Sequence, residues 1–282
     1  MNVKHLLSKG DFRGVASAVA EQLPPDHVQR IADTLWLKRG GTALIATGFF
    51  VGDRPETDGP LGAVALARAL TALDYRTVLV SRADCIRLLK AACDFKTELA
   101  DFSVQGATRS EATARRILQT FNPKVLIGVE VCGPNRFGLY CDMRGRDISA
   151  MTPKMDLLFS LGKDQSRYTI GIGDGGNEVG FGNARPNLVR SKGVEPCVTK
   201  TSALIVAAIS NWGAYGLVQC LSRHAGRSLL PTLGAERDRL RLMVSKGAVD
   251  GFSGRPVARV DGRPIKEYEW LLRRLRSMPK PR

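Results

Sequence analysis

A regular alternation of short apolar runs with helical patterns limits the possible folds of this chain more than any other property. The apolar run 42–47 is bounded by glycines and is typical of a buried strand. The Ala- and Leu-rich segment 61–73 follows Pro60, a residue favoured at the first position of a helix. The run 76–81 then predicts a second strand. A strand, a helix and a strand in this order form a βαβ unit, so the two strands should be parallel.

The alternation continues along the chain and predicts an α/β fold with an open, mostly parallel, Rossmann-like sheet that carries helices on both faces. Further strands are predicted at 124–129 and 168–172, helices at 84–92, 109–121, 154–161, 201–220, 237–245 and 266–276, and a hairpin at 257–264. The segment 12–37 predicts two helices separated by Pro24 and Pro25. We therefore assign residues 1–39 to a small N-terminal helical region and 40–282 to the α/β domain.

The composition is that of a folded protein without a membrane span. The chain has 282 residues, of which 44% are hydrophobic and 24% charged. No run approaches the ~18 uncharged apolar residues of a spanning helix, and no secretory signal is visible, so we expect a cytoplasmic protein. The six cysteines form no CxxC pair, which argues against a zinc knuckle or a thioredoxin-type redox site and favours free thiols.

The net charge of +15 is concentrated near the C-terminus. The segment 219–282 carries 15 basic and 6 acidic residues, enough to attract a nucleic acid or an anionic membrane. No nucleic-acid-binding motif and no interleaved aromatic residues accompany this charge. A solvated surface is therefore the favoured interpretation, with neither a nucleic acid nor a membrane as partner.

Acidic residues follow three of the predicted strands, and this is the main indication of function. They are found in the segment 56–60, at Glu130 and in the glycine-rich segment 171–180. Open α/β sheets bind their ligands outside the carboxyl ends of the strands, where these residues should meet. Because gathered carboxylates repel one another, such a cluster needs a cation, a shared proton or a positively charged substrate group.

Each acidic segment also has a purely structural interpretation. Asp58 stands just ahead of a Gly-Pro helix start, where an aspartate commonly caps a helix. Glu130 can be a solvated strand end, and Asp174 can belong to a packed glycine turn. The last is least favoured, because segment 171–180 holds five glycines, a density typical of backbone that turns sharply or approaches a ligand.

The glycine-rich segment also matches the dinucleotide-binding pattern, at Gly171, Gly173 and Gly176. In that pattern the loop opens a helix whose N-terminus binds pyrophosphate. Here glycines continue to Gly182, and two carboxylates in the loop would repel a pyrophosphate. We therefore favour a metal or amine site over a bare nucleotide site.

Two further segments are weaker candidates. Segment 210–216 has glycines three residues apart in a helical run, which indicates close packing or a pocket wall to which Asn211 contributes a hydrogen bond. Ser253 lies in a glycine turn that is not a Gly-x-Ser-x-Gly elbow, and the chain has only three histidines. A serine-hydrolase triad is therefore poorly supported.

Four motifs together resemble the C-terminal domain of the D-glutamate cyclase family. They are Glu56–Pro60 with Gly62 and Ala63, Gly171–Glu178 with Gly180 and Gly182, Ser210–Gly213 with Tyr215, and Ser253–Gly254 with Val260–Gly262. The resemblance extends from about residue 41 to 271. It implies an α/β lyase that converts D-glutamate to 5-oxo-D-proline with loss of water.

The implied reaction is consistent with the acidic cluster. Ring closure needs a base for the protonated amine and a proton donor or Lewis acid for the departing oxygen. Hard oxygen ligands and scarce histidines favour Mg²⁺, Mn²⁺ or Ca²⁺ as a cofactor over Zn²⁺. The predicted catalytic residues are Asp58, Glu130, Asp174, Asn177 and Glu178. The predicted metal ligands are Asp58, Glu130, Asp174 and Glu178. The residues predicted to bind the substrate are Glu56, Thr57, Gly59, Gly173, Gly175, Gly176, Asn211 and Trp212.

Some expectations stay open at this point. The resemblance leads us to expect a Glu-Arg pair after the third strand, but the chain has Glu130-Val131 and an arginine only at Arg136. An arginine clamp on a substrate carboxylate is therefore displaced or absent. The predicted partner is a small amino-acid substrate, and a homodimer is possible. The alternatives are a metal-dependent hydrolase of a phosphorylated small molecule and a non-catalytic amino-acid or nucleotide sensor.

Overall fold

A six-stranded parallel sheet forms the centre of the protein, of which the computed structural model describes residues 3–278. In sheet order the strands are β5 (Glu98–Asp101), β4 (Arg76–Ser81), β1 (Thr42–Thr47), β6 (Val125–Val129), β7 (Tyr168–Gly173) and β8 (Ala203–Val206). Counted along the chain, this is the 3-2-1-4-5-6 order of a Rossmann fold. The predicted fold class is confirmed, and the order of strands reverses between β1 and β6.

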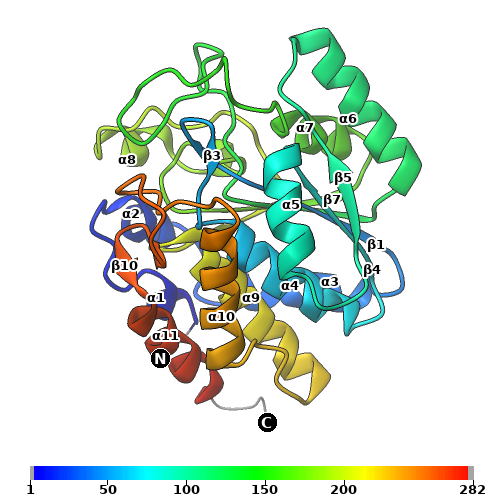
Figure 1. The fold of residues 1–282 in the computed structure, drawn as a ribbon, viewed down its shortest axis with the longest axis vertical. Helices are drawn as coiled ribbons and strands as arrows, with labels where there is room; N and C mark the ends of the chain where they lie inside the picture. The colour runs from blue at the N-terminus through cyan, green and yellow to red at the C-terminus, as the bar shows by residue number, and fades with distance from the viewer. Residues whose placement is uncertain (1–2, 279–282) are drawn as a thin grey trace.

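Helices cover both faces of the sheet, because alternate residues of each strand point to opposite faces. In β1, Ala43 and Ile45 pack in one apolar core, whereas Leu44 and Ala46 pack in another. The first face carries α3 (His27–Leu37), α4 (Pro60–Thr71), α5 (Ala83–Ala92), α9 (Ser210–Ala225), α10 (Leu233–Ser245) and α11 (Ile265–Arg276), and the second α6 (Ala107–Phe121) and α7 (Asp156–Asp164). Figure 1 shows these two groups of helices on opposite sides of the sheet.

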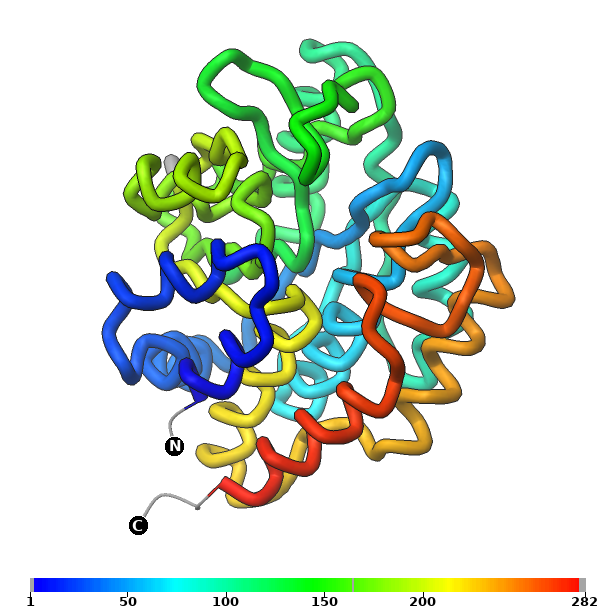
Figure 2. Tube along the Cα trace, turned by 90° about the vertical axis from the view of Figure 1, so that its left-hand side faces the viewer, coloured from blue at the N-terminus to red at the C-terminus, as the bar shows by residue number. Residues whose placement is uncertain are grey.

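The N-terminal helices pack against the rest of the protein. Leu6 and Leu7 of α1 (Val3–Leu7) are buried in the core that α3 and α9 share, and the Leu7 carbonyl accepts a hydrogen bond from Ala208. The helix α2 (Val15–Glu21) packs against α8 (Pro186–Arg190) and β8. In Figure 2 this N-terminal segment, in blue, lies beside the yellow α9. The sequence predicts α2 and α3 but not α1.

The structure corrects one predicted helix and adds short elements. The segment 201–220 is not a single helix, since residues 203–206 form β8 and α9 begins at Ser210. The strand β5, a hairpin of β2 (Phe50–Val51) and β3 (Arg54–Pro55), and the 3₁₀ turn η1 (Phe181–Asn183) are not predicted. The predicted hairpin is confirmed as β9 (Arg259–Val260) and β10 (Arg263–Pro264), and both of its turn residues have positive φ.

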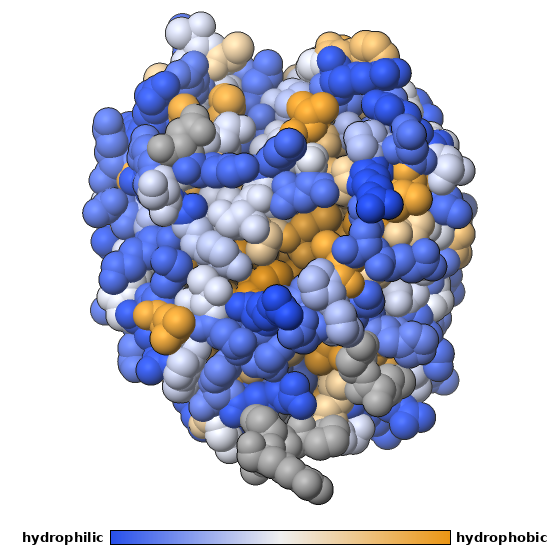
Figure 3. All heavy atoms as spheres, turned by 180° about the vertical axis from the view of Figure 1, so that it is seen from behind, coloured by the Kyte–Doolittle hydropathy of each residue, from blue (hydrophilic) through white to orange (hydrophobic). Residues whose placement is uncertain are grey.

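The surface seen from behind is predominantly hydrophilic (Figure 3). Among the described residues, no helix combines the length and apolarity needed to cross a bilayer.

Candidate active site

The helices α4 and α9 begin side by side at the carboxyl edge of the sheet. A side chain from the loop before α4 caps α9, and a side chain from the first turn of α9 caps α4. The Asp58 carboxylate accepts hydrogen bonds from the backbone N–H groups of Ser210 and Asn211, both at 2.9 Å. The Asn211 side-chain oxygen accepts from the N–H groups of Gly59 (3.0 Å) and Gly62 (2.7 Å). Asp58 therefore is a helix cap, but for α9 rather than for the helix that follows it.

Glu130 is held in a strained conformation directly after β6. Its φ of 54° lies in the left-handed region, which non-glycine residues adopt at a cost. The Ser210 hydroxyl donates a hydrogen bond to the Glu130 carboxylate. A Cβ at Gly59 would lie only 2.7 Å from the Glu130 Cβ, so a glycine is needed there. The loop after β1 and the start of α9 thus fix Glu130 together.

The glycine-rich loop after β7 wraps around the carboxylate of Glu178. This carboxylate accepts backbone hydrogen bonds from Gly175 and Gly176, both at 2.8 Å, and a longer one from Asp174 at 3.3 Å. A Cβ at Gly173 would lie 2.9 Å from it. The N–H groups that would bind pyrophosphate in a dinucleotide site are therefore taken by the protein's own carboxylate. This agrees with the preference against a bare nucleotide site.

Arg13, which the sequence does not single out, enters the acidic cluster from the N-terminal segment. Its guanidinium bridges Asp174 (2.9 Å) and Asp261 (2.8 Å), and its side chain is 16% exposed. Burial alone would lower the pKa of Arg13, but the surrounding carboxylates raise it above its usual value. Arg13 therefore stays charged and neutralises part of the cluster.

Asp174 is only partly satisfied by Arg13. Its Oδ1 accepts from the guanidinium, whereas its Oδ2 is buried without a hydrogen-bond partner among the described residues. Burial raises the pKa of Asp174 well above its usual value; Arg13 opposes this rise, and Asp261 and Glu178 add to it. An unpaired buried carboxylate oxygen of this kind is suited to a proton or a cation.

Other carboxyl groups of the cluster are also shifted towards their neutral form. Burial raises the pKa of Glu56 and of Glu130 well above the usual value, and neighbouring carboxylates add to the shift. Burial and Asp261 raise the pKa of Asp58 to about 8, against three backbone hydrogen bonds that lower it. Burial likewise raises the pKa of Asp261, and Arg13 lowers it. The cluster therefore binds protons near neutral pH unless a cation replaces them.

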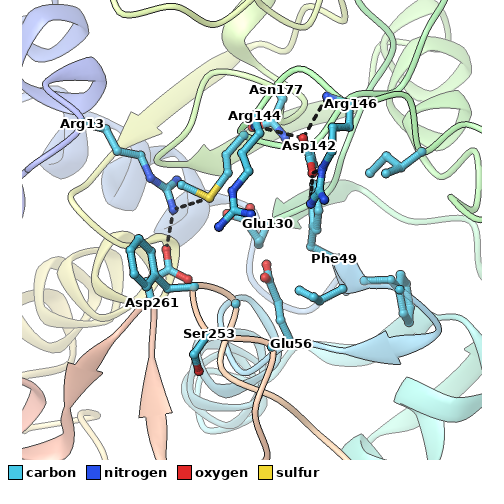
Figure 4. Close-up of a pocket in the computed structure, with 18 residues that line it drawn as sticks. Arg13, Phe49, Glu56, Glu130, Asp142, Arg144, Arg146, Asn177, Ser253 and Asp261 are labelled. Carbon is cyan, nitrogen blue, oxygen red and sulfur yellow. Dashed lines mark hydrogen bonds and ion pairs between the residues drawn. The ribbon is translucent and has the colours of Figure 1, made fainter.

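A cavity of about 220 Å³ opens onto this cluster (Figure 4). It is smaller than the ~300–1,000 Å³ of drug-sized ligand sites, and so suits a small metabolite. Glu56, Glu130 and Asp261 line one side of it, with Arg13 paired to Asp261. Arg144 and Arg146 of the loop after β6 line the opposite side, with Asp142 paired to Arg146. Carboxyl groups therefore predominate on one wall, called the acidic wall, and arginines on the other, called the basic wall.

The predicted site residues fall into two groups. Glu56, Glu130 and Asn177 line the cavity, and the Asn177 amide donates to the Cys141 carbonyl at 2.9 Å. The others are buried next to the cavity or further away: Asp58, Asp174, Glu178, Thr57, Gly59, Gly173, Gly175, Gly176, Asn211 and Trp212.

Thr57 and Trp212 contact other parts of the fold. The Thr57 hydroxyl donates to the Arg259 carbonyl at 2.8 Å, which attaches the loop after β1 to the 259–264 hairpin. Trp212 is 2% exposed and packs edge-on against Tyr268, with ring centroids 6.0 Å apart. Asp261 is in the cluster although it is not among the predicted site residues. Its place within the motif Val260–Gly262 is the signal that could have pointed to it.

The carboxylates fit a divalent cation. Oxygens of Asp58, Asp174 and Asp261 lie within 4.8 Å of one another, and so do oxygens of Glu130, Asp174 and Glu178. Asp174 belongs to both sets and contributes the unpaired Oδ2. Carboxylate oxygens are the ligands that Mg²⁺, Mn²⁺ and Ca²⁺ prefer. The four predicted metal ligands thus divide between two overlapping sets.

Residues 2–276 match the family described as D-glutamate cyclase-like, C-terminal. The chain belongs to this family. The human mitochondrial D-glutamate cyclase is 28% identical over 275 residues. That match covers 82% of this family member and 44% of the human protein, so the chain spans less than half the length of this relative.

Solved structures give weaker similarities to this D-glutamate cyclase-like chain. An actinorhodin polyketide ketoreductase variant with NADPH has a TM-score of 0.29 and 12% identity over 66% of each chain. A mycobacterial protein complexed with NADPH has a TM-score of 0.28 and 13% identity, over 85% of this chain and 65% of the other. Both TM-scores are too low to indicate the same fold.

Proposed function

We propose that this protein cyclises D-glutamate to 5-oxo-D-proline with loss of water. The observation that carries the proposal is the small cavity with carboxyl groups of raised pKa along one wall, in a member of the D-glutamate cyclase-like family. Its acidic wall suits the ammonium group of an amino acid, and its basic wall suits a carboxylate. The product assignment rests on the family, since the relative's name gives the activity of a longer protein.

The reaction needs groups that move protons between two atoms of the substrate. The ammonium nitrogen loses two protons as it forms the new C–N bond, and one carboxylate oxygen leaves with two protons as water. No net proton is taken up or released. Glu56 and Glu130 both line the cavity, and their raised pKa values let one be ionised while the other is neutral. An ionised carboxylate can accept a proton from the amine, and a neutral one can donate to the departing oxygen.

We further propose that a divalent cation, Mg²⁺, Mn²⁺ or Ca²⁺, binds at the acidic cluster. Asp174 with its unpaired Oδ2, Glu130 and Glu178 would hold it. When bound, such an ion supplies a Lewis acid for a carboxylate oxygen and offsets the repulsion among the carboxylates. Arg13 already neutralises Asp174 and Asp261 on the other side of the cluster.

The alternative of a phosphoester hydrolase is less favoured by the geometry. The loop after β7 has no free backbone N–H groups at Gly175 and Gly176 to offer a phosphate, because both donate to Glu178. The acidic wall would also repel a phosphate dianion. The other alternative from the sequence, a non-catalytic amino-acid sensor, would bind the same ligand as the cyclase but release it unchanged.

The test is an incubation of the purified protein with D-glutamate, with each of the three ions added in turn. Chiral chromatography should show 5-oxo-D-proline, with a mass one water below that of the substrate. L-glutamate should react more slowly, because inversion at the α-carbon moves the amine away from the base. D-glutamate recovered unchanged with every ion would refute the proposal, and release of phosphate from phosphorylated small molecules would then support the hydrolase.

A further inference from the structure

Arg144 is the one cavity-lining cation, among the residues that the structure describes, with no ion pair or hydrogen bond to its guanidinium. It lies at the tip of the loop between β6 and α7, and Figure 4 shows its side chain pointing into the cavity. The other two cavity-lining arginines are paired: Arg13 with Asp174 and Asp261, and Arg146 with Asp142. Arg144 is exposed, so its charge is available to a ligand.

The backbone around Arg144 is well fixed. Cys141 and Asp147 pair in an antiparallel bridge, and Gly145 takes a positive φ of 76° at the turn. The Asp142 carboxylate accepts hydrogen bonds from the N–H groups of Arg144 and Arg146, both at 2.9 Å. We call residues 141–147 the arginine hairpin. Asp142 holds its tip so that Arg144 is presented to the cavity.

Arg136, the first arginine after β6, is not placed to do this. It pairs with Glu195 at 3.2 Å, its guanidinium lies 4.7 Å from the centre of the Phe137 ring, and it is not among the residues that line the cavity. The position expected for an arginine next to Glu130 holds Val131, which is buried in the core beneath α6 and α7. Of the arginines in this loop, Arg144 and Arg146 line the cavity, and Arg146 is paired with Asp142.

We propose that Arg144 binds a carboxylate of the substrate and that Asp142 is the residue that positions it. A ligand with a carboxylate on Arg144 and an ammonium group towards Glu56 and Glu130 would match both walls of the cavity. This inference deepens the proposed function by naming the residue that selects an acidic substrate, and it rests on that function only for the identity of the amino acid. A carboxylate suits the site better than a phosphate, because its single charge is repelled less by the acidic wall.

The experiment measures binding apart from turnover. Glutarate has both carboxylates of glutamate but no amine, so it cannot cyclise. Its dissociation constant is measured by calorimetry for the wild type and for Arg144→Met, Arg144→Lys, Asp142→Ala, Arg136→Met and the double variant Asp142→Ala with Arg144→Met. D-glutamate and inorganic phosphate serve as further probes. Arg144 is exposed, so Arg144→Met should fold normally, as its melting temperature would show.

Arg144→Met should weaken glutarate binding by about 10- to 100-fold, the range expected when one charge-assisted hydrogen bond is lost. Arg144→Lys should recover part of the affinity, because lysine keeps the charge but not the paired donors. Arg136→Met should bind like the wild type. Asp142→Ala removes the oxygen that accepts from the Arg144 and Arg146 N–H groups, so it should weaken binding in the wild-type background. It should add little in the double variant with Arg144→Met, as expected if Asp142 acts through Arg144.

Equal glutarate affinity in the wild type and Arg144→Met would overturn the inference, as would the absence of glutarate binding to the wild type. Tighter binding of inorganic phosphate than of glutarate, lost in Arg144→Met, would also overturn it in favour of a phosphate ligand. Arg144-dependent glutarate binding in a protein that does not convert D-glutamate would support the inference and refute only the cyclase function.

Discussion

Replacement of Arg13 by methionine should destabilise the protein strongly, and more at high pH than at low pH. Arg13 contacts Asp174 and Asp261 at 2.9 and 2.8 Å, and the two carboxylates are 2% and 6% exposed. Removal of one partner of such a buried ion pair costs about 3–5 kcal/mol, because the remaining charges are left unpaired. For a chain of this size, about 2–4 °C per kcal/mol predicts a drop in melting temperature of about 6–20 °C.

The pH dependence follows from the two carboxyl groups. In the wild type, burial raises the pKa of Asp174 and of Asp261, and Arg13 opposes the rise. Without Arg13 both pKa values rise further, so each group is neutral over a wider range of acidic pH. A neutral carboxyl group costs less to bury than a carboxylate, so the destabilisation by Arg13→Met should shrink as the pH falls.

The assay is thermal unfolding of wild type and variant in the presence of a chelator, at about pH 8 and about pH 5. Arg30→Met is the matched control, because Arg30 pairs with Asp26 on the surface, where the two side chains are 68% and 52% exposed. Such an exposed pair contributes about 0–1 kcal/mol. A loss for Arg13→Met no larger than that for Arg30→Met, or an equal loss at both pH values, would refute the reasoning.

Three further predictions concern the same cluster. A divalent cation that binds only the folded protein should stabilise it by about 2.7 kcal/mol at a hundredfold excess over the dissociation constant, which raises the melting temperature. Asp174→Asn should remove that rise, and no shift in the wild type would argue against the cation site. Without a cation, stability should fall as the pH rises from about 4 through about 8, because a carboxyl group with a raised folded-state pKa, such as Asp58, stabilises the protein only while it is neutral. Asp58→Asn should therefore reduce the slope of melting temperature against pH, and an unchanged slope would contradict this. Gly251→Ala should lower turnover at least tenfold, since its Cβ would lie 2.4 Å from the Glu56 carboxylate and 2.7 Å from the Asp261 carboxylate and would displace them, whereas Gly234→Ala, with open space around it, should leave turnover unchanged; equal turnover in the two variants would count against a role for these carboxylates.

The central strands could be predicted because their signal is local. The bounds of β1 and β4 coincide with the predicted 42–47 and 76–81, since each is a buried run closed by glycine or polar residues. The edge strand β5 could not be predicted, because its four residues are half-exposed and too few for a periodic pattern. Such a strand is defined by its backbone hydrogen bonds to β4, which also set its register, rather than by its composition.

The boundary between β8 and α9 shows how a distant residue decides local structure. The sequence from Ala203 to Ile209 is continuously apolar, and periodicity cannot separate a buried strand from a buried helix in such a run. The helix begins at Ser210 because the Asp58 carboxylate caps its first N–H groups from 152 residues away. No pattern near Ser210 contains that information.

The candidate site was predictable to the extent that it follows the strands. Glu56, Glu130 and Asp174 all come after parallel strands, whose carboxyl ends meet at one edge, so their proximity follows from the fold. Arg13 and Arg144 lie outside this rule. Arg13 comes from a short segment between two glycines of positive φ, and Arg144 from an irregular loop, so neither position follows from a periodic pattern.

The most direct test of the account is the rate of 5-oxo-D-proline formation from D-glutamate in Glu130→Gln compared with Glu98→Gln. Glu130 lines the cavity, whereas Glu98 pairs with Arg76 on the surface at the edge of the sheet. The account predicts product from the wild type, a loss of about 10²- to 10⁴-fold in Glu130→Gln, as for removal of a catalytic acid or base, and no loss in Glu98→Gln. A Glu130→Gln variant that folds and forms 5-oxo-D-proline at the wild-type rate would contradict it.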